Sequence, residues 1–293
     1  MANAIGGINL AQIAQESLKT LVAESPLLAA FSTDFSAGVA DAGESIATRV
    51  ANSVTAVDAS EGYDATDVTS TAKTITLSNH IHFTSAFTDL EVSRGGYALL
   101  ERTFARPAVY AVMNKMTNSV MELITNANFS ANTIVASGDF DSNDVADIAG
   151  ALSAANVSRN ERSLILGSAY HTALAKDDSV KSALAFGSSS AIQDGRVARL
   201  AGLDVYEYSA IPANAQNLVG FACNREALLV ASRQPSLPAN FSGQVESVTA
   251  PNGLTIQYRT WYENKEGKHY ITATLIYGVA VGVPANLHRI LSA

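Results

Sequence analysis

Two short segments carry residue types that could bind a metal ion, and each lacks part of the pattern it needs. Asp139-Phe140-Asp141-Ser142-Asn143 begins like a calcium loop, but that loop needs glycine at its sixth position and glutamate at its twelfth, which here are Asp144 and Gly150. We therefore interpret the segment as a loop that caps a helix. His80 and His82 share one face of a predicted strand, but a zinc site needs at least one more ligand. We expect both histidines to be solvated.

A third segment could carry a nucleophile. Gly167-Ser168-Ala169-Tyr170-His171 follows a predicted strand, but the second glycine of the G-x-S-x-G elbow is missing. Ser168 is better explained as the cap of the next helix, and an α/β enzyme acting through Ser168 or His171 stays as a minor alternative. Cys223 lies in an apolar strand and is interpreted as an inert buried thiol. We expect no catalytic residue, no cofactor and no metal.

The composition limits the class of protein. A length of 293 residues with 47% hydrophobic residues suggests about two domains with real cores. One cysteine forbids an internal disulfide, which indicates synthesis in a reducing cytoplasm, and no apolar run approaches the ~20 residues of a membrane span. A net charge of −8 without a lysine or arginine run disfavours sequence-reading nucleic-acid binding. Charged residues make up 16%, against roughly 25% in ordinary proteins, which fits either extensive subunit interfaces or large cores.

Residues 44–90 are predicted to form a long two-stranded hairpin with almost no core of its own. Strands at about 46–57 and 68–87 flank a polar, acidic turn at 58–67. The second strand alternates between a polar and an apolar face, as a half-buried strand does. An isolated hairpin is marginal in water, so the apolar face must be covered, and we expect a neighbouring subunit to cover it. The candidate intersubunit contacts on this face are Ile75, Leu77, Ile81, Phe83 and Phe87.

A helix is predicted before the hairpin, and Ser25-Pro26 ends it. Its apolar residues recur at helical spacing and form one stripe: Leu10, Ile13, Ala14, Leu18, Leu21 and Val22. The helix could dock on its own core or on a neighbour. We include Leu18 and Leu21 among the candidate intersubunit contacts.

Three further regions follow the hairpin. Pro107 is well placed to begin a helix of about 18 residues with a methionine-containing apolar face, which is typical of a core-facing helix. Residues 141–235 alternate between helices and strands and are predicted to form a compact α/β domain. The C-terminal part is β-rich, with alternation over 256–262, a turn at 264–268 and a returning strand at 269–283.

This order of elements resembles the major capsid protein of tailed bacteriophages, whose fold is shared with encapsulins and the herpesvirus capsid floor. The most family-like string runs from Gly195 to Tyr206, GRVARLAGLDVY, followed by Ser209 and Ile211-Pro212. The resemblance implies an α+β fold with an N-terminal arm, an extended β-hairpin loop, a long spine helix, an α/β axial domain and a β-rich peripheral domain. The ranges it implies are 1–43 for the arm, 44–90 for the loop, 141–235 for the axial domain, and 91–140 plus 236–293 for the peripheral domain.

The function that the resemblance implies is structural. Such a subunit self-assembles into pentamers and hexamers that form an icosahedral head shell around phage double-stranded DNA, without sequence recognition and without a membrane. We expect it in the virion capsid, and in the host cytoplasm during assembly. Expected partners are other copies, a separate scaffolding protein, because only some 43 residues precede the hairpin, a portal and decoration proteins. Lys73 is the only lysine of the hairpin, and we expect no crosslink. The alternative is an encapsulin-type nanocompartment shell around an enzyme cargo.

Overall fold

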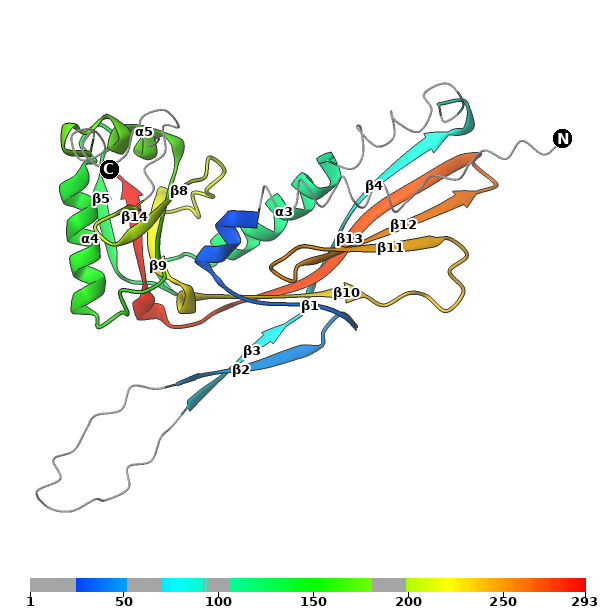
Figure 1. Ribbon diagram of the computed structural model, residues 1–293, viewed down its shortest axis with the longest axis horizontal. Helices are drawn as coiled ribbons and strands as arrows, with labels where there is room; N and C mark the ends of the chain where they lie inside the picture. Colours follow the sequence, from blue (N-terminus) through cyan, green and yellow to red (C-terminus); the bar gives the residue numbers. More distant parts are fainter. Residues whose placement is uncertain (1–24, 52–69, 92, 94–105, 181–198) are drawn as a thin grey trace, which may run out of the picture.

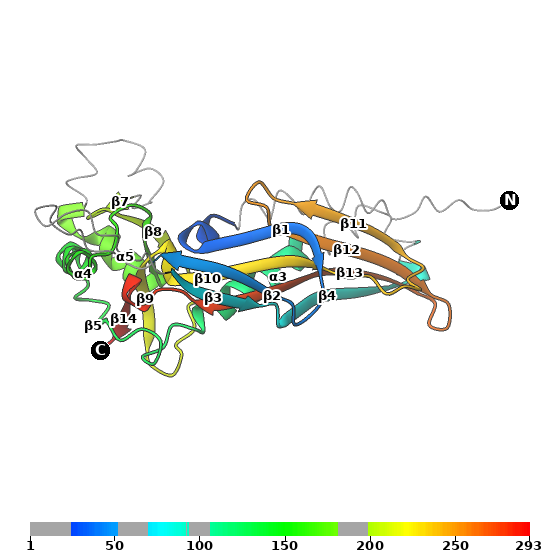
Figure 2. The same cartoon turned by 90° about the horizontal axis from the view of Figure 1, so that it is seen from below.

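The computed structural model describes residues 25–51, 70–91, 93, 106–180 and 199–293. Two six-stranded sheets and a two-stranded ribbon account for the strands of this part of the chain. Figure 1 shows one sheet with its helices at one end of an elongated molecule, the other sheet along the long axis, and the ribbon projecting from the body. Seen from below in Figure 2, the long sheet again extends away from the smaller domain. No helix in the described ranges is long and apolar enough to cross a membrane.

The long sheet is built around β13, the longest strand. β13 pairs with β10, β12 and β4 in antiparallel fashion, β12 pairs with β11, and β1 joins β10 in parallel. The predicted C-terminal strand pair is therefore confirmed as β12 and β13. The strands of this sheet are β1 (Ser32–Ala40), β4 (Asn79–Thr88), β10 (Leu228–Pro235), β11 (Gln244–Thr249), β12 (Thr255–Glu263) and β13 (Lys268–Val281).

The second sheet has the order β5-β14-β9-β6-β8-β7. Helices α4 (Ser142–Ala154) and α5 (Ser168–Lys176) cover one face with their apolar residues, while the other face joins the main core. Two short 3₁₀ helices, η4 (Arg225–Ala227) and η5 (Pro284–Asn286), connect strands of the two sheets, and a third, η1 (Ser25–Ala30), precedes β1. The strands are β5 (Asn132–Val135), β6 (Arg162–Leu166), β7 (Arg199–Leu200), β8 (Leu203–Glu207), β9 (Leu218–Asn224) and β14 (Leu287–Ser292).

The predicted spine helix is confirmed as α3 (Arg106–Met121). Its apolar side chains are buried in the main core: Ala108, Val109, Val112, Met113, Met116, Val120 and Met121. The methionines are therefore core residues, as their spacing predicts. Beyond the C-terminus of α3, the side-chain amide of Asn214 donates to the carbonyls of Met121 (2.8 Å) and Ile124 (2.9 Å). These bonds join the C-terminal end of α3 and the turn that follows it to the loop before β9.

The two sheets divide the chain differently from the expected range 141–235. β10 lies in that range but belongs to the long sheet, and β5 and β14 lie outside it but complete the second sheet. The reason is long-range pairing, because β14 inserts between β5 and β9 from the C-terminal end of the chain. Local periodicity carries no information about such an insertion. The predicted helix before Ser25 lies outside the described residues.

Candidate functional site

The predicted hairpin is divided into two parts. β2 (Ser45–Ala51) pairs with β3 (Ser70–Thr76) to form the ribbon, but the second strand breaks at Leu77-Ser78, and β4 continues alone. At the break, Gly43 N donates to Leu77 O and Leu77 N donates to Glu44 O, both at 2.8 Å. The expectation of one continuous strand from 68 to 87 is therefore wrong. Its second half pairs with β13 instead, as part of β4 (Asn79–Thr88).

The apolar face of β4 is covered by the chain itself. The predicted alternation is confirmed, because successive residues of β4 alternate between half-buried and exposed. Ile81, Phe83 and Phe87 pack against the main core, to which α3 and β13 also contribute. This cover explains the alternation without a second copy, since the same period arises whichever surface covers the strand.

The base of the ribbon is anchored in the body. Ile75 is 2% exposed and Leu77 is 0% exposed. Both pack in a small core with Ala40, Leu229, Ala231 and Ile276. The ribbon crosses β13 at Gly278, where an added Cβ atom would lie 2.3 Å from Thr76 O. Only glycine permits this approach of the two backbones. Leu18 and Leu21, the other candidate contacts, lie outside the described residues.

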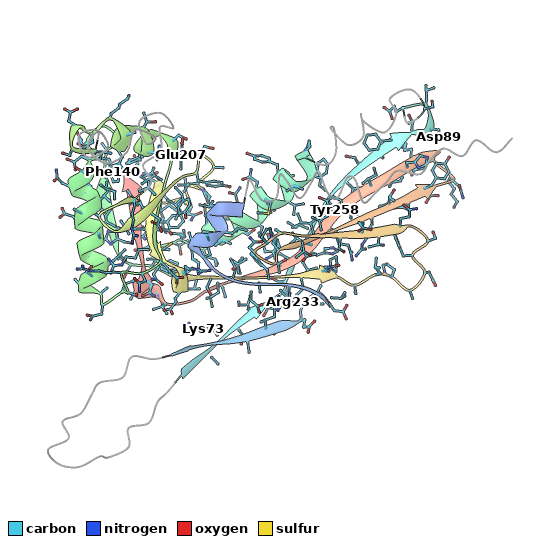
Figure 3. The ribbon with its side chains drawn as sticks, viewed as in Figure 1. Lys73, Asp89, Phe140, Glu207, Arg233 and Tyr258 are labelled. Carbon is cyan, nitrogen blue, oxygen red and sulfur yellow. The ribbon has the colours of Figure 1, made fainter. Side chains whose placement is uncertain are left out.

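Beyond this base the ribbon projects away from the body (Figure 1). Its two described strands pair with one another, and Ala47, Ala72 and Thr74 are exposed. Figure 3 shows Lys73 on this projecting part. The ribbon therefore combines a fixed base with an outer part that has little core of its own.

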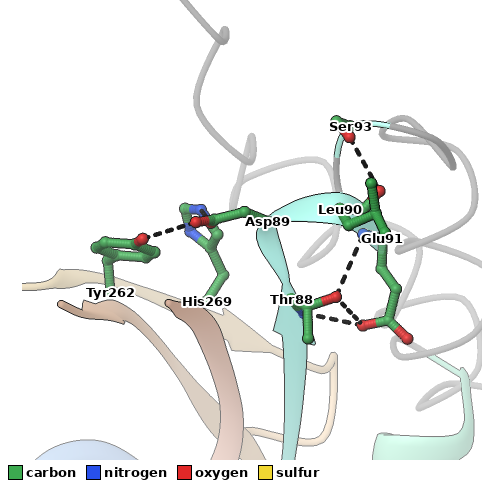
Figure 4. Close-up of polar contacts among 7 residues, drawn as sticks. All are labelled: Thr88, Asp89, Leu90, Glu91, Ser93, Tyr262 and His269. Carbon is green, nitrogen blue, oxygen red and sulfur yellow. Dashed lines mark hydrogen bonds and ion pairs between the residues drawn. The ribbon is translucent and has the colours of Figure 1, made fainter. Parts of the chain in front are cut away.

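The far end of the long sheet is closed by polar contacts (Figure 4). The hydroxyl of Tyr262 donates to Asp89 Oδ2 at 2.8 Å, and His269 Nε2 lies 3.5 Å from Asp89 Oδ1. The hydrogen bond to the carboxylate raises the pKa of the Tyr262 phenol. Thr88 and Glu91 bond reciprocally, since Thr88 N donates to Glu91 Oε2 (2.8 Å) and Glu91 N donates to Thr88 Oγ1 (3.3 Å). This capping-box geometry turns the chain where β4 ends.

The residues with metal-binding types have structural partners. Asp141 is the N-cap of α4 and accepts from Asp144 N (3.1 Å), Asn143 Nδ2 (2.9 Å) and Asn143 N (2.8 Å), which lowers the pKa of its carboxyl group. The predicted capping loop is thus confirmed, with Asp141 as the cap. His80 Nε2 and His82 Nδ1 form hydrogen bonds with Thr274 Oγ1 (2.9 Å) and Thr84 Oγ1 (3.0 Å). Within the described ranges, no three potential ligands are grouped as a metal ion would require.

The residues that could act as a nucleophile or a base, Ser168, His171 and Cys223, occupy structural positions. The expectation that Ser168 caps the next helix is wrong, because the N-cap of α5 is Gly167 and Ser168 is the first helical residue. His171 Nδ1 lies 3.7 Å from Glu207 Oε2, on β8. Cys223 is buried, and burial raises the pKa of its thiol to about 12. A thiol that stays protonated is a poor nucleophile, which agrees with an inert packing role.

The residue that sequence reasoning missed is Gly278. It interrupts the predicted strand 269–283, and an isolated glycine in a strand is a known sign of close backbone approach. The pattern could therefore have indicated a crossing at this position, though not which segment crosses.

Comparisons with known proteins find similar structures but no similar sequence. No protein-family model and no curated protein matches the sequence. The capsid of cyanophage P-SCSP1u is similar in structure, with a TM-score of 0.61 at 11% identity over 90% of this chain and 86% of that one. The mature capsid of bacteriophage PhiM1 gives 0.58 at 10% identity, over 89% and 85% of the two chains. The virus-like particle from Pyrococcus furiosus gives 0.55 at 13% identity, over 95% and 97%. The chain therefore has the α+β fold of tailed-phage major capsid proteins.

Proposed function

We propose that this chain is the major capsid protein of a tailed phage, and that it self-assembles into pentamers and hexamers of an icosahedral shell around double-stranded DNA. The observation that carries the proposal is the likeness to phage capsid chains, which extends over 90% and 89% of this chain in the two phage structures. A likeness of this extent includes both sheets, and not only a common α/β unit.

The mechanism that we propose is burial of the outer ribbon on an adjacent copy. The part of the ribbon that projects outward from the Ile46–Ile75 pair has little core of its own, and an isolated two-stranded hairpin is marginal in water. A neighbouring surface would supply the missing cover, while contacts that close into rings keep the assembly finite. Stable contacts between proteins bury on the order of 1,200–2,000 Å². A projecting ribbon adds to such an area without enlarging the body.

The same proposal gives the chain its partners and place. Other copies are the principal partner, with a separate scaffolding protein, a portal and decoration proteins as further ones. The packaged DNA is enclosed without sequence recognition, in keeping with a net charge of −8. The location is the virion capsid after assembly in the host cytoplasm.

Electron microscopy of the purified chain, with scaffolding protein supplied where needed, tests the proposal. Closed particles are expected from the wild-type chain. A variant in which residues 47–74 are replaced by an Asn-Gly turn keeps Ile75 and Leu77, so we expect it to fold but not to close shells. Monomeric wild-type protein under every assembly condition would refute the proposal, and normal shells from the shortened variant would refute the role of the ribbon.

An encapsulin-type nanocompartment is a second candidate, because the similar Pyrococcus furiosus structure is a virus-like particle and the two chains cover 95% and 97% of one another. The contents separate the two candidates. Nuclease-protected DNA inside particles from producing cells supports the phage capsid, and a co-purifying enzyme without DNA supports the nanocompartment.

A further inference from the structure

A cavity lined by arginines lies beside the second half of α4. Its walls come from α4, from the segment between α4 and β6, and from the turn between β7 and β8. It has a volume of about 530 Å³. The ten residues that line it include three arginines and no carboxylate: Ala146, Ala149, Gly150, Ser153, Arg159, Asn160, Arg162, Arg199, Ala201 and Gly202. A concentration of three positive charges is unusual on a chain whose net charge is −8.

Of the three arginines, Arg162 is buried, whereas Arg159 and Arg199 are exposed. Arg162 is 3% exposed and donates from Nη1 to Ala149 O of α4 at 3.2 Å. In the segment after the helix, its Nε lies 2.8 Å from Ser158 O and its Nη2 2.6 Å from Val157 O. It therefore holds the C-terminus of the helix, where a cation is favourable. Arg159 is exposed at the cavity. Arg199 is 63% exposed and lies 3.6 Å from the half-exposed Asp204, which makes a weak surface pair.

The arginines of this cavity carry like charges and repel one another. Burial, and after it the charge of the nearby Arg159, lower the pKa of Arg162. Two guanidinium groups are thus held near each other without a lining carboxylate between them. The small side chains of the walls leave room for an incoming group, because an added Cβ atom at Gly150 or Gly202 would meet no atom within 4 Å. Both features suit an oxyanion, which arginine binds through paired N–H donors.

The same domain carries a cavity of opposite charge. It lies at the N-terminal end of α4, between the loop at 137–141 and α5, and has a volume of about 540 Å³. Its charged lining residues are Asp139, Asp141, Lys176, Asp177 and Asp178. Asp139 and Asp178 are exposed to solvent. Asp141 and Asp177 are partly buried and accept backbone N–H groups of α4. The domain therefore has an acidic end and a basic end, separated along a helix of about 20 Å.

We propose that the arginine cavity is a docking site for a second copy of this chain, and that the exposed Asp139 and Asp178 of that copy approach Arg159 and Arg199. This inference rests on the proposed function, in which copies form rings. Around a ring each subunit presents two different surfaces to its two neighbours, and an acidic and a basic surface on one domain are complementary. Exposed charges of this kind set register and association rate more than stability. Duplex DNA is the less suitable occupant, since the acidic end of the same small domain would repel it.

Charge reversal and its repair test the proposal. Arg159→Glu/Arg199→Glu places like charges across the contact, and we expect the protein concentration needed for assembly to rise at least about tenfold, with an unchanged thermal midpoint. Adding Asp139→Lys/Asp178→Lys to this variant should restore assembly. A second quadruple variant, with Glu122→Lys/Glu246→Lys instead, restores the net charge alone and should stay defective. Arg159→Lys/Arg199→Lys keeps both charges and should assemble normally.

Each outcome supports or overturns either the docking site or the proposed function. Shells from Arg159→Glu/Arg199→Glu at the wild-type concentration, or equal repair by both quadruple variants, would overturn the docking site and leave the proposed function intact. Normal empty shells that package less DNA would assign the cavity to nucleic acid instead. A wild-type chain that forms no shells would overturn the proposed function, and the docking site with it.

Discussion

Gly278→Ala tests the anchoring of the ribbon most directly. The new Cβ atom would lie 2.3 Å from Thr76 O and 2.9 Å from both the Thr76 carbonyl carbon and Ile75 Cγ2, whereas ordinary contact begins at 3.4 Å. β3 must then move away from β13 by about 1 Å, since backbone atoms cannot rotate out of the way. Overpacking of this kind costs about 1–3 kcal/mol, and the displacement also loosens the buried Ile75 and Leu77.

The expected result has two parts, one for stability and one for assembly. The loss lowers the thermal midpoint by roughly 2–10 °C, followed by circular dichroism. The ribbon leaves the body at a changed angle, so we expect fewer closed particles by electron microscopy and faster proteolytic cleavage between residues 44 and 78. Gly150→Ala is the control for stability, because its Cβ atom would meet nothing within 4 Å. An unchanged midpoint together with normal particles would refute the reasoning that the crossing at Gly278 fixes the ribbon.

Three further predictions concern the body. Phe83→Asp/Phe87→Asp should unfold the long sheet of the isolated subunit, at a cost of at least about 5 kcal/mol, while amide exchange of α4 stays slow; an unchanged subunit stability would show that these rings face another copy. Burial lowers the pKa of His288 below its ordinary 6.5, so the folded state favours the neutral ring, and stability should fall as the pH drops through the folded-state pKa; His288→Gln should remove that dependence from the pH profile of urea unfolding. Asp141→Ala should cost about 1 kcal/mol in the same assay, and a smaller loss than for the exposed Asp147→Ala would contradict the capping role.

Sequence periodicity predicts faces better than it predicts partners. The apolar spacing of α3 and the alternation along β4 are local patterns, and the structure reproduces both. The C-terminal strand pair is reproduced as well, but the alternation predicted over 256–262 is not, because β12 is buried on both faces over residues 255–258. The cover of β4 could not be predicted, because the alternation is the same whether the main core with α3 or another subunit covers the apolar face. The insertion of β14 into the second sheet could not be predicted from the sequence either, since its partner β5 lies some 150 residues earlier.

The sequence shows which catalytic patterns are incomplete, but it does not show which residues contact another subunit. Missing pattern residues, such as the absent second glycine after Ser168, are read from the sequence alone. The arginine cavity needs three separate segments to meet, since Arg159, Arg162 and Arg199 stand on both sides of α5 in the sequence. A sequence scan for basic runs cannot find such a site, because no two of these arginines are adjacent and Arg199 lies 37 residues after Arg162.

The ribbon has a base that is buried in its own chain and an outer part that is not, so different contacts determine the conformation of each part. Ile75 and Leu77 are buried by the chain itself, so the direction in which the ribbon leaves the body is set before any neighbour arrives. Beyond the base the two strands pair through their backbones, and Ala47, Ala72 and Thr74 are exposed; an isolated pair of strands gains little stability alone. Order in the outer part should therefore depend on contact with another copy, whereas its direction should not. A subunit that fixes direction in advance loses less conformational entropy on assembly, which favours one geometry of contact over the many that a free arm could reach.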